Sequence, residues 1–185
     1  MEYQDRCAGC GISQELRRVP GGIVKLAGNW VVNQYGSSEG FLGWLALQPR
    51  YHRNEISQLT RDELSALGPN IQSLDRSLRQ YWHLHFPGDE LCRVYVVYFF
   101  ESEFQDPPQD PPYHLHIHII PRPSSFDTAD RLRRVENGVR WVDGWRTPNL
   151  MPRGVVPAPY QRGGNDWEHR VAQLSAYLRG ELNGW

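Results

Sequence analysis

The chain has 185 residues, a hydrophobic fraction of 39% and a formal net charge of −1. These values fit one globular domain, or one domain with an appendage, and they exclude an overall polyanion-binding composition. No apolar run reaches the length of a membrane span, and the N-terminal residues lack the basic and apolar pattern of a secretory signal. With three cysteines and no export signal, we expect reduced thiols in the cytoplasm rather than a disulfide framework.

The first part of the chain predicts a short knuckle and a β-hairpin. Residues 1–20 are polar and contain Cys7-Ala-Gly-Cys10, which we expect to form a knuckle rather than regular structure. Residues 29–34 and 41–48 are predicted as two strands separated by a Gly/Ser loop, which is the pattern of a hairpin. Pro49 ends the second strand.

The clearest helix begins at Thr60. Thr60 and Glu63 have the spacing of a capping box, and Leu59 and Leu64 occupy the hydrophobic-staple positions around it. Apolar residues then repeat at helical spacing and predict one stripe packed on a sheet: Leu64, Leu67, Ile71, Leu74 and Leu78. Pro69 interrupts this pattern, so we expect a kink or a regular part that starts later.

The second half of the chain predicts further strands and a last helix. Residues 91–100 are β-branched and aromatic, so we expect a buried central strand, followed by a stiff proline-rich loop at 105–112. Residues 124–164 predict irregular cover with one short helix near 127–135. The apolar spacing within 166–182 predicts an amphipathic helix.

Histidines alternate with apolar residues in the segment HLHIHII, residues 114–120, which Pro121 and Pro123 end. Because successive side chains of a strand point to opposite faces, His114, His116 and His118 share one face at a spacing of roughly 6.6–7 Å. Imidazole can act as a base, a nucleophile or a metal ligand near neutral pH, so we expect a reactive site here. The alternative is a polar strand face whose histidines only meet water.

Cys7 and Cys10 have the spacing at which two thiolates bind one tetrahedral zinc ion. A redox pair is the alternative for this motif in a cytosolic protein. A closed zinc site needs two further ligands, and His52 and His114 are candidates of the right chemical type. The alternative for His52 is an exposed loop histidine.

The segment from His114 to Arg122, HLHIHIIPR, resembles the signature of the histidine-triad (HIT) superfamily of nucleotide hydrolases and transferases. The segment from Gly43 to His52, GWLALQPRYH, is similar to the hairpin strand before that signature. An N-terminal CxxC occurs in the zinc-containing branch of the superfamily. The resemblance covers residues 7–123 and implies an HIT-like α+β fold, with an antiparallel sheet of about five strands and a long helix on one face.

The resemblance also implies ligands for a metal. In the zinc-containing branch the ligands correspond to Cys7, Cys10, His52 and His114 of this chain. This closed set implies a structural zinc that joins the N-terminus and the hairpin to the histidine strand.

The resemblance assigns the chemistry to the other two histidines of the row. His116 corresponds to the nucleophile, whose Nε2 attacks the α-phosphorus of a nucleotide. His118 is expected beside the phosphate oxygens, where it donates a hydrogen bond. The remaining substrate contacts are expected from Asn33, Trp44 and Gln109.

This chain departs from the family pattern at several places. Trp44 stands where family members usually have another histidine. Asp110 and Pro111 occupy the positions of a Gln and a Ser or Thr that contact phosphate, so Gln109 is the nearest substitute, and residues 99–103 lack an expected Asn. Asp106 and Asp110 would repel a polyphosphate.

We therefore expect an HIT-like domain at 1–123 and a C-terminal extension at 124–185 packed on it. The expected function is that of a nucleotide phosphohydrolase or nucleotidyl transferase, in a cytoplasmic homodimer. The expected partner is a nucleotide or nucleotide conjugate, with no membrane partner and no nucleic acid. The alternatives are a nucleotide-binding module with little turnover and an enzyme that removes adenylates from nucleic-acid ends.

Overall fold

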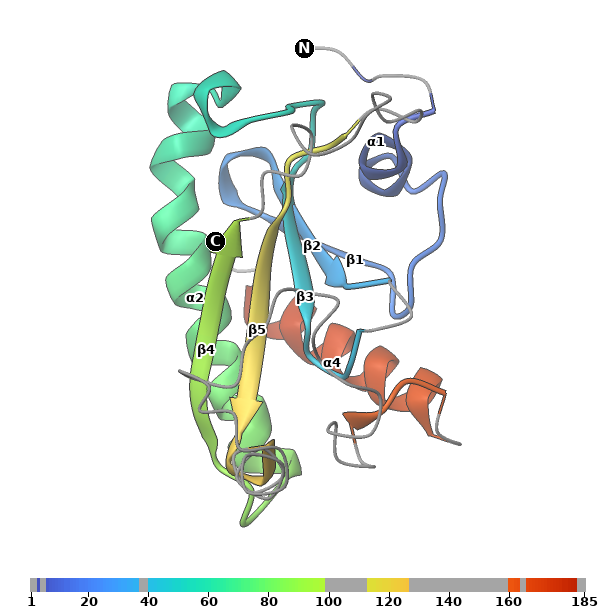
Figure 1. Cartoon of the computed structure of the whole chain (residues 1–185), viewed down its shortest axis with the longest axis vertical. Coiled ribbons are helices and arrows are strands. Elements are labelled where there is room, and N and C mark those ends of the chain that lie inside the picture. Colours follow the sequence, from blue (N-terminus) through green and yellow to red (C-terminus); the bar gives the residue numbers. More distant parts are fainter. Residues whose placement is uncertain are drawn as a thin grey trace, which may run out of the picture.

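A computed structural model describes residues 3, 6–36, 40–98, 113–126, 160–163 and 166–182. Within these ranges the chain forms an α+β structure with one five-stranded antiparallel sheet, as the sequence predicts. Figure 1 shows helix α2 running alongside β4 and helix α4 lying near β1. None of the helices in these ranges is long and apolar enough to cross a membrane.

The sheet has the strand order β1-β2-β3-β5-β4. Its strands are β1 (Ile23–Leu26), β2 (Trp30–Gln34), β3 (Leu45–Pro49), β4 (Leu91–Tyr98) and β5 (Ile117–Pro123). Strands β2 and β3 form the predicted hairpin, and β5 lies between β3 and β4. The histidine segment is therefore joined to the hairpin on one side of the sheet and to an edge strand on the other.

The prediction of a buried central strand at 91–100 is wrong, because β4 is an edge strand of the described sheet. Among the described strands it pairs only with β5, and several of its side chains are exposed, with Val96 44% exposed. A β-branched composition is typical of strands in general and does not distinguish an edge from a centre.

The prediction that Pro121 and Pro123 end the histidine strand is wrong. The paired strand starts at Ile117 and includes both prolines. Strand β3 pairs with β5 only over Ile117 to Ile119, so from Ile120 onward β5 has β4 as its one neighbour. At such an edge a proline can lie in a strand, because the missing N–H donor leaves no ladder bond unmade.

Helix α2 (Arg61–His85) begins with the predicted capping box. The Thr60 hydroxyl accepts a hydrogen bond from the Glu63 backbone N–H, and the Glu63 carboxylate accepts one from the Thr60 N–H. The prediction that Pro69 delays the regular part of the helix is wrong, because α2 starts at Arg61 and is one continuous element through Pro69. Pro69 lies in the third turn and is exposed, so its ring points away from the packed face.

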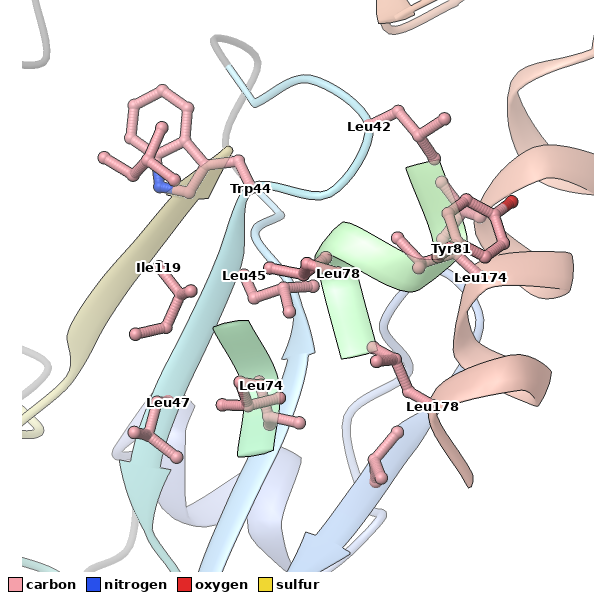
Figure 2. Close-up of a cluster of buried hydrophobic side chains, with 14 of the residues drawn as sticks. Leu42, Trp44, Leu45, Leu47, Leu74, Leu78, Tyr81, Ile119, Leu174 and Leu178 are labelled. Atoms are coloured by element: carbon pink, nitrogen blue, oxygen red, sulfur yellow. The ribbon is translucent and has the colours of Figure 1, made fainter. Parts of the chain in front are cut away.

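The core lies between the sheet and two helices, α2 and α4 (Trp167–Leu182). Figure 2 shows Leu45, Leu47 and Ile119 of the strands facing leucines of both helices, Leu74, Leu78, Leu174 and Leu178. The predicted stripe of α2 is only partly buried, because Leu64 at its start is exposed. Helix α4 shares this core, so the C-terminal part of the chain packs on the same sheet.

The 3-10 helices η1 (Ala27–Asn29) and η2 (Ile56–Gln58) are short connections. The predicted knuckle is instead a short helix, α1 (Ala8–Ser13), whose N-cap is Cys7. The Cys7 Sγ accepts a hydrogen bond from the Cys10 backbone N–H at 3.4 Å. A cap at the first cysteine of a CxxC motif lets the chain begin a helix there, which the polar composition did not indicate.

Candidate active site and metal cluster

The histidine row lies on the face of the sheet opposite α2 and α4. Leu115, Ile117 and Ile119 point into the helix-covered core, as predicted. His114 and His118 are 6% and 1% exposed, and His116 is half-buried. The alternative of a polar strand face that only meets water is therefore wrong. The first two histidines precede β5, where an extended backbone is held by a 2.7 Å hydrogen bond from the Leu115 N–H to the Arg53 carbonyl.

Side chains from three distant parts of the chain meet at His114 and could hold a metal ion. The ligand atoms of Cys7, Cys10, His52 and His114 all lie within 4.8 Å of one another. Nδ1 of His114 is 3.3 Å from the Cys7 Sγ and 3.6 Å from the Cys10 Sγ, and Nδ1 of His52 is 3.4 Å from the Cys10 Sγ. With Zn–S bonds of ~2.3 Å and Zn–N bonds of ~2.0 Å, sulfur and nitrogen ligands of a tetrahedral zinc lie roughly 3.5 Å apart. The donor set and its spacing therefore fit zinc.

The orientation of His114 also fits a metal ligand. Its Nε2 lies 2.9 Å from the Pro49 carbonyl oxygen, which can only accept, so Nε2 carries the proton and the lone pair is on Nδ1. Burial lowers the pKa of His114 to about 4. At Gly9 a Cβ atom would lie 2.4 Å from the His114 Cγ, so only glycine lets α1 approach the ring this closely.

His52 belongs to this cluster and is not an exposed loop residue. It is half-buried, and burial lowers its pKa. Its partner Cys10 is 42 residues away along the chain, so the CxxC spacing alone does not indicate His52, and only the family resemblance assigned it as a ligand.

His116 has the orientation that a nucleophile needs. Its Nδ1 lies 2.9 Å from the carbonyl oxygen of His114, so Nδ1 donates and the lone pair of the neutral ring is on Nε2. Two tyrosine rings flank it, with centroids 5.6 Å away for Tyr113 and 6.4 Å away for Tyr35. His116 also lines a cavity, so a ligand can reach this ring.

His118 is held in the opposite tautomer by Trp44. The Trp44 indole N–H donates to Nδ1 of His118 at 2.9 Å, so the proton of the neutral His118 ring is on Nε2. Burial, followed by the neighbouring His116, lowers the pKa of His118 to about 3. The ring centroids of His116 and His118 are 4.7 Å apart. In their neutral forms, His116 thus has a lone pair on Nε2, whereas His118 has an N–H donor at Nε2.

Trp44 is expected to contact the substrate, but its side chain is buried. Its side chain is 0% exposed and lies beneath Tyr35, with ring centroids 5.1 Å apart. A fully buried indole presents no surface to a ligand, and its polar group is directed at His118. The residue in place of the usual hairpin histidine therefore positions another histidine.

The cavity in front of His116 has a volume of about 520 Å³, within the range of small-molecule sites. Its walls come from α1 and the residues after it, from β2 and β3, and from the residues before β5. Asn33 lines it, as expected of a substrate contact, and is 4% exposed. The Asn33 amide donates to the Gln34 carbonyl at 2.9 Å, whereas its Oδ1 has no hydrogen-bond partner among the described residues.

Some sequence predictions lie outside the described residues. They concern Gln109 with Asp106, Asp110 and Pro111, the departure at 99–103, the loop at 105–112 and the short helix at 127–135. Conversely, the cavity includes Arg17, Arg18, Tyr35, Tyr113 and Arg162, which the sequence analysis missed. These residues follow no shared motif, because they come together only when the N-terminal segment folds across the sheet.

No family model matches the sequence, and no curated protein matches it. Among solved structures, the chain is similar to a HIT family protein from Bacillus anthracis str. 'Ames Ancestor', known from a crystal structure at 2.01 Å resolution. The two chains share 15% sequence identity with a TM-score of 0.49, over 77% of this chain and 83% of that chain. A functional assignment therefore depends on the geometry of the site itself.

Proposed function

We propose that this chain is an HIT-type nucleotide phosphohydrolase or nucleotidyl transferase that acts through a covalent intermediate on His116. The observation that supports this most is the orientation of the ring. Nδ1 of His116 donates a hydrogen bond to the His114 carbonyl, so Nε2 carries the lone pair that is available for attack. A histidine that merely fills a strand face needs no such fixed tautomer and no cavity in front of it.

In the first step Nε2 of His116 forms a bond to the α-phosphorus of the nucleotide, and the bond from phosphorus to the leaving-group oxygen breaks. The leaving group departs with the electron pair. The imidazole ring becomes positively charged, and the hydrogen bond from Nδ1 to the His114 carbonyl stabilises that charge. In the second step water or another hydroxyl acceptor attacks phosphorus, the P–N bond breaks, the lone pair returns to Nε2, and the proton of the acceptor is released to solvent.

His118 stabilises the charge that develops on the phosphate oxygens. Trp44 occupies Nδ1 of His118, so the ring can donate only from Nε2. With a pKa of about 3 the ring is neutral near pH 7, and it acts as a hydrogen-bond donor without a net charge. The ring is 1% exposed and does not line the cavity in front of His116, so in this mechanism the ring or its neighbours must move to let Nε2 reach the phosphate.

We also propose that the cluster of Cys7, Cys10, His52 and His114 binds one structural zinc ion. Four protein ligands fill a tetrahedral site, so the ion supplies a cross-link between α1, the segment after β3 and the histidine row. Cys7 and Cys10 form no disulfide here, and in this reduced form both can lose a proton and bind a metal as thiolates.

The function is tested by trapping. The protein is mixed with nucleotides labelled at the α-phosphate, quenched under alkaline conditions, digested and analysed by mass spectrometry. We expect a nucleotidyl group on the peptide that contains His116, and none in His116→Ala. His83→Ala, which changes an exposed histidine on α2, is the control and should still form the adduct. Equal turnover with and without His116 would refute the mechanism, and nucleotide binding without any adduct or turnover would favour a binding module.

A further inference from the structure

The charged side chains that line the cavity in front of His116 all have the same sign. They are Arg17, Arg18 and Arg162, and no aspartate or glutamate is among the described residues that line it. The chain as a whole has a net charge of −1, so this local excess of positive charge does not follow from the composition. Such a lining raises the local concentration of anions.

Arg17 and Arg18 are held at the cavity by the segment that carries the metal cluster. After α1 the backbone N–H groups of Leu16 and Arg17 both donate to the Gly11 carbonyl, at 2.9 and 3.0 Å. The Gln48 amide of β3 donates to the Gly9 carbonyl and to the Ser13 hydroxyl, each at 3.0 Å, and fixes α1 on the sheet. The backbone of both arginines is therefore positioned relative to the histidine row.

The nearest acidic residue on this segment does not neutralise them. Glu15 pairs with Lys25 of β1 at 3.4 Å, and neither of these two residues lines the cavity. Arg162 reaches the cavity from the C-terminal part of the chain, where its guanidinium donates to the Gly36 carbonyl. Arg17 and Arg18 are exposed residues of the cavity wall.

We infer that the substrate carries a second anionic group, besides the phosphate that reacts at His116, and that Arg17 and Arg18 bind it. The inference rests on the proposed function, because it takes His116 as the position of the reacting phosphate. Guanidinium groups bind phosphate oxygens through paired, charge-assisted hydrogen bonds, so a second phosphate is the group that fits best. It is either a further phosphate of the 5′ chain or a phosphate on the ribose.

The test compares adenine nucleotides, because they share one base and differ in the number and position of their phosphates. Binding of AMP, ADP and adenosine 3′,5′-bisphosphate is measured by calorimetry at low ionic strength, where exposed charges are least screened. For the wild type we expect ADP or the bisphosphate to bind at least about tenfold more tightly than AMP. Which of the two gains affinity identifies the side of the nucleotide that carries the second group.

The double variant Arg17→Gln/Arg18→Gln should lose this gain in affinity for the doubly phosphorylated ligand. Its affinity for AMP should change by less than about threefold, because exposed charges that do not contact AMP contribute little to its binding. Arg17→Lys/Arg18→Lys should keep part of the gain, because the charge remains. The matched control is Arg61→Gln/Arg76→Gln, which removes the same charge from exposed positions on α2 and should keep the gain in full.

Three results would overturn the inference: no gain for either doubly phosphorylated ligand in the wild type, an unchanged gain in the glutamine variant, or an equal loss of AMP affinity. The trapping experiment on His116 is independent of these measurements. An adduct without an arginine-dependent gain leaves the proposed function intact and removes this inference. A gain that depends on the arginines, without any adduct, would show that they bind a second anionic group and would remove the proposed reaction at His116.

Discussion

The metal cluster and the reacting pair are built on one row of histidines, but they use the same ring atom in different ways. At His114 the Nδ1 atom faces two thiols, at His116 it donates to a carbonyl, and at His118 it accepts from an indole. The strand period places all three rings on one face. The partners that fix each ring come from the start of α1, from the neighbouring backbone and from the residue before β3, so identical residues acquire separate functions.

The largest expected difference between the two regions concerns His116 and His114. We expect His116→Ala to lower kcat/KM at least about 10³-fold, because it removes the nucleophile, while the metal content and Tm stay close to wild type. His114→Ala should lose the metal and unfold at a lower temperature. The measurements are nucleotide turnover, metal analysis and thermal unfolding of both variants. A His116→Ala protein that loses its metal would show that the two regions are not separate.

Removal of the metal should affect stability more than any single core contact. Cys7→Ser/Cys10→Ser, or treatment with a strong chelator, is expected to reduce the free energy of unfolding by about 3 kcal/mol or more, since metal binding contributes directly to folding. Denaturant unfolding measures this loss. Cys92→Ser, at an exposed cysteine on β4, is the control and should change it little. Wild-type protein with no bound metal and an oxidised Cys7–Cys10 pair would instead support the redox alternative.

The buried third histidine gives the reacting region a dependence on pH. In the folded protein the pKa of His118 is about 3, against 6.5 in the unfolded chain, so only the unfolded state takes up this proton between those values. Its contribution to stability is complete above pH ~6.5 and decreases as the pH falls, by about 2 kcal/mol at pH 5.

His118→Asn should remove this dependence, because the amide does not titrate. Denaturant unfolding of wild type and variant at pH 7 and pH 5 gives the change in the free energy of unfolding for each protein. The difference between these two changes measures the contribution of His118, because any pH effect of the metal cluster is the same in both proteins and cancels. Parallel pH curves for the two proteins would mean that His118 is already protonated or solvated in the fold.

The smallest expected effect tests the indole that positions His118. Trp44→Phe keeps a large ring but removes the N–H donor to Nδ1, so we expect kcat to fall about tenfold with KM nearly unchanged. Trp82→Phe is the matched control, because that indole is also 0% exposed and lies in the core between the sheet and the helices. It should cost stability without a comparable loss of kcat. Equal losses of kcat would reduce Trp44 to a packing residue.

The features that the sequence predicts well are local in the chain. The alternation in 114–120 sets the face of each histidine, Thr60 and Glu63 mark the start of α2, and the spacing of Cys7 and Cys10 indicates a metal pair. Each of these signals depends on residues a few positions apart, whose geometry follows from the strand or helix period.

The features that were missed depend on distant contacts. The partner of Trp44 is 74 residues away, and Arg17 lines the cavity just after α1, which Gln48 holds on the sheet from 39 residues along the chain. The edge position of β4 and the prolines of β5 follow from the strand order, which composition does not specify. Tertiary context decided these points over local propensity.

Nitrogen-15 NMR of the metal-loaded protein near pH 7 tests the assignment of the three rings most directly, because it reports which nitrogen of each histidine is protonated. We expect a proton on Nδ1 of His116, and protons on Nε2 of both His114 and His118. A proton on Nε2 of His116 would contradict this assignment, because the atom proposed to attack phosphorus would then have no lone pair.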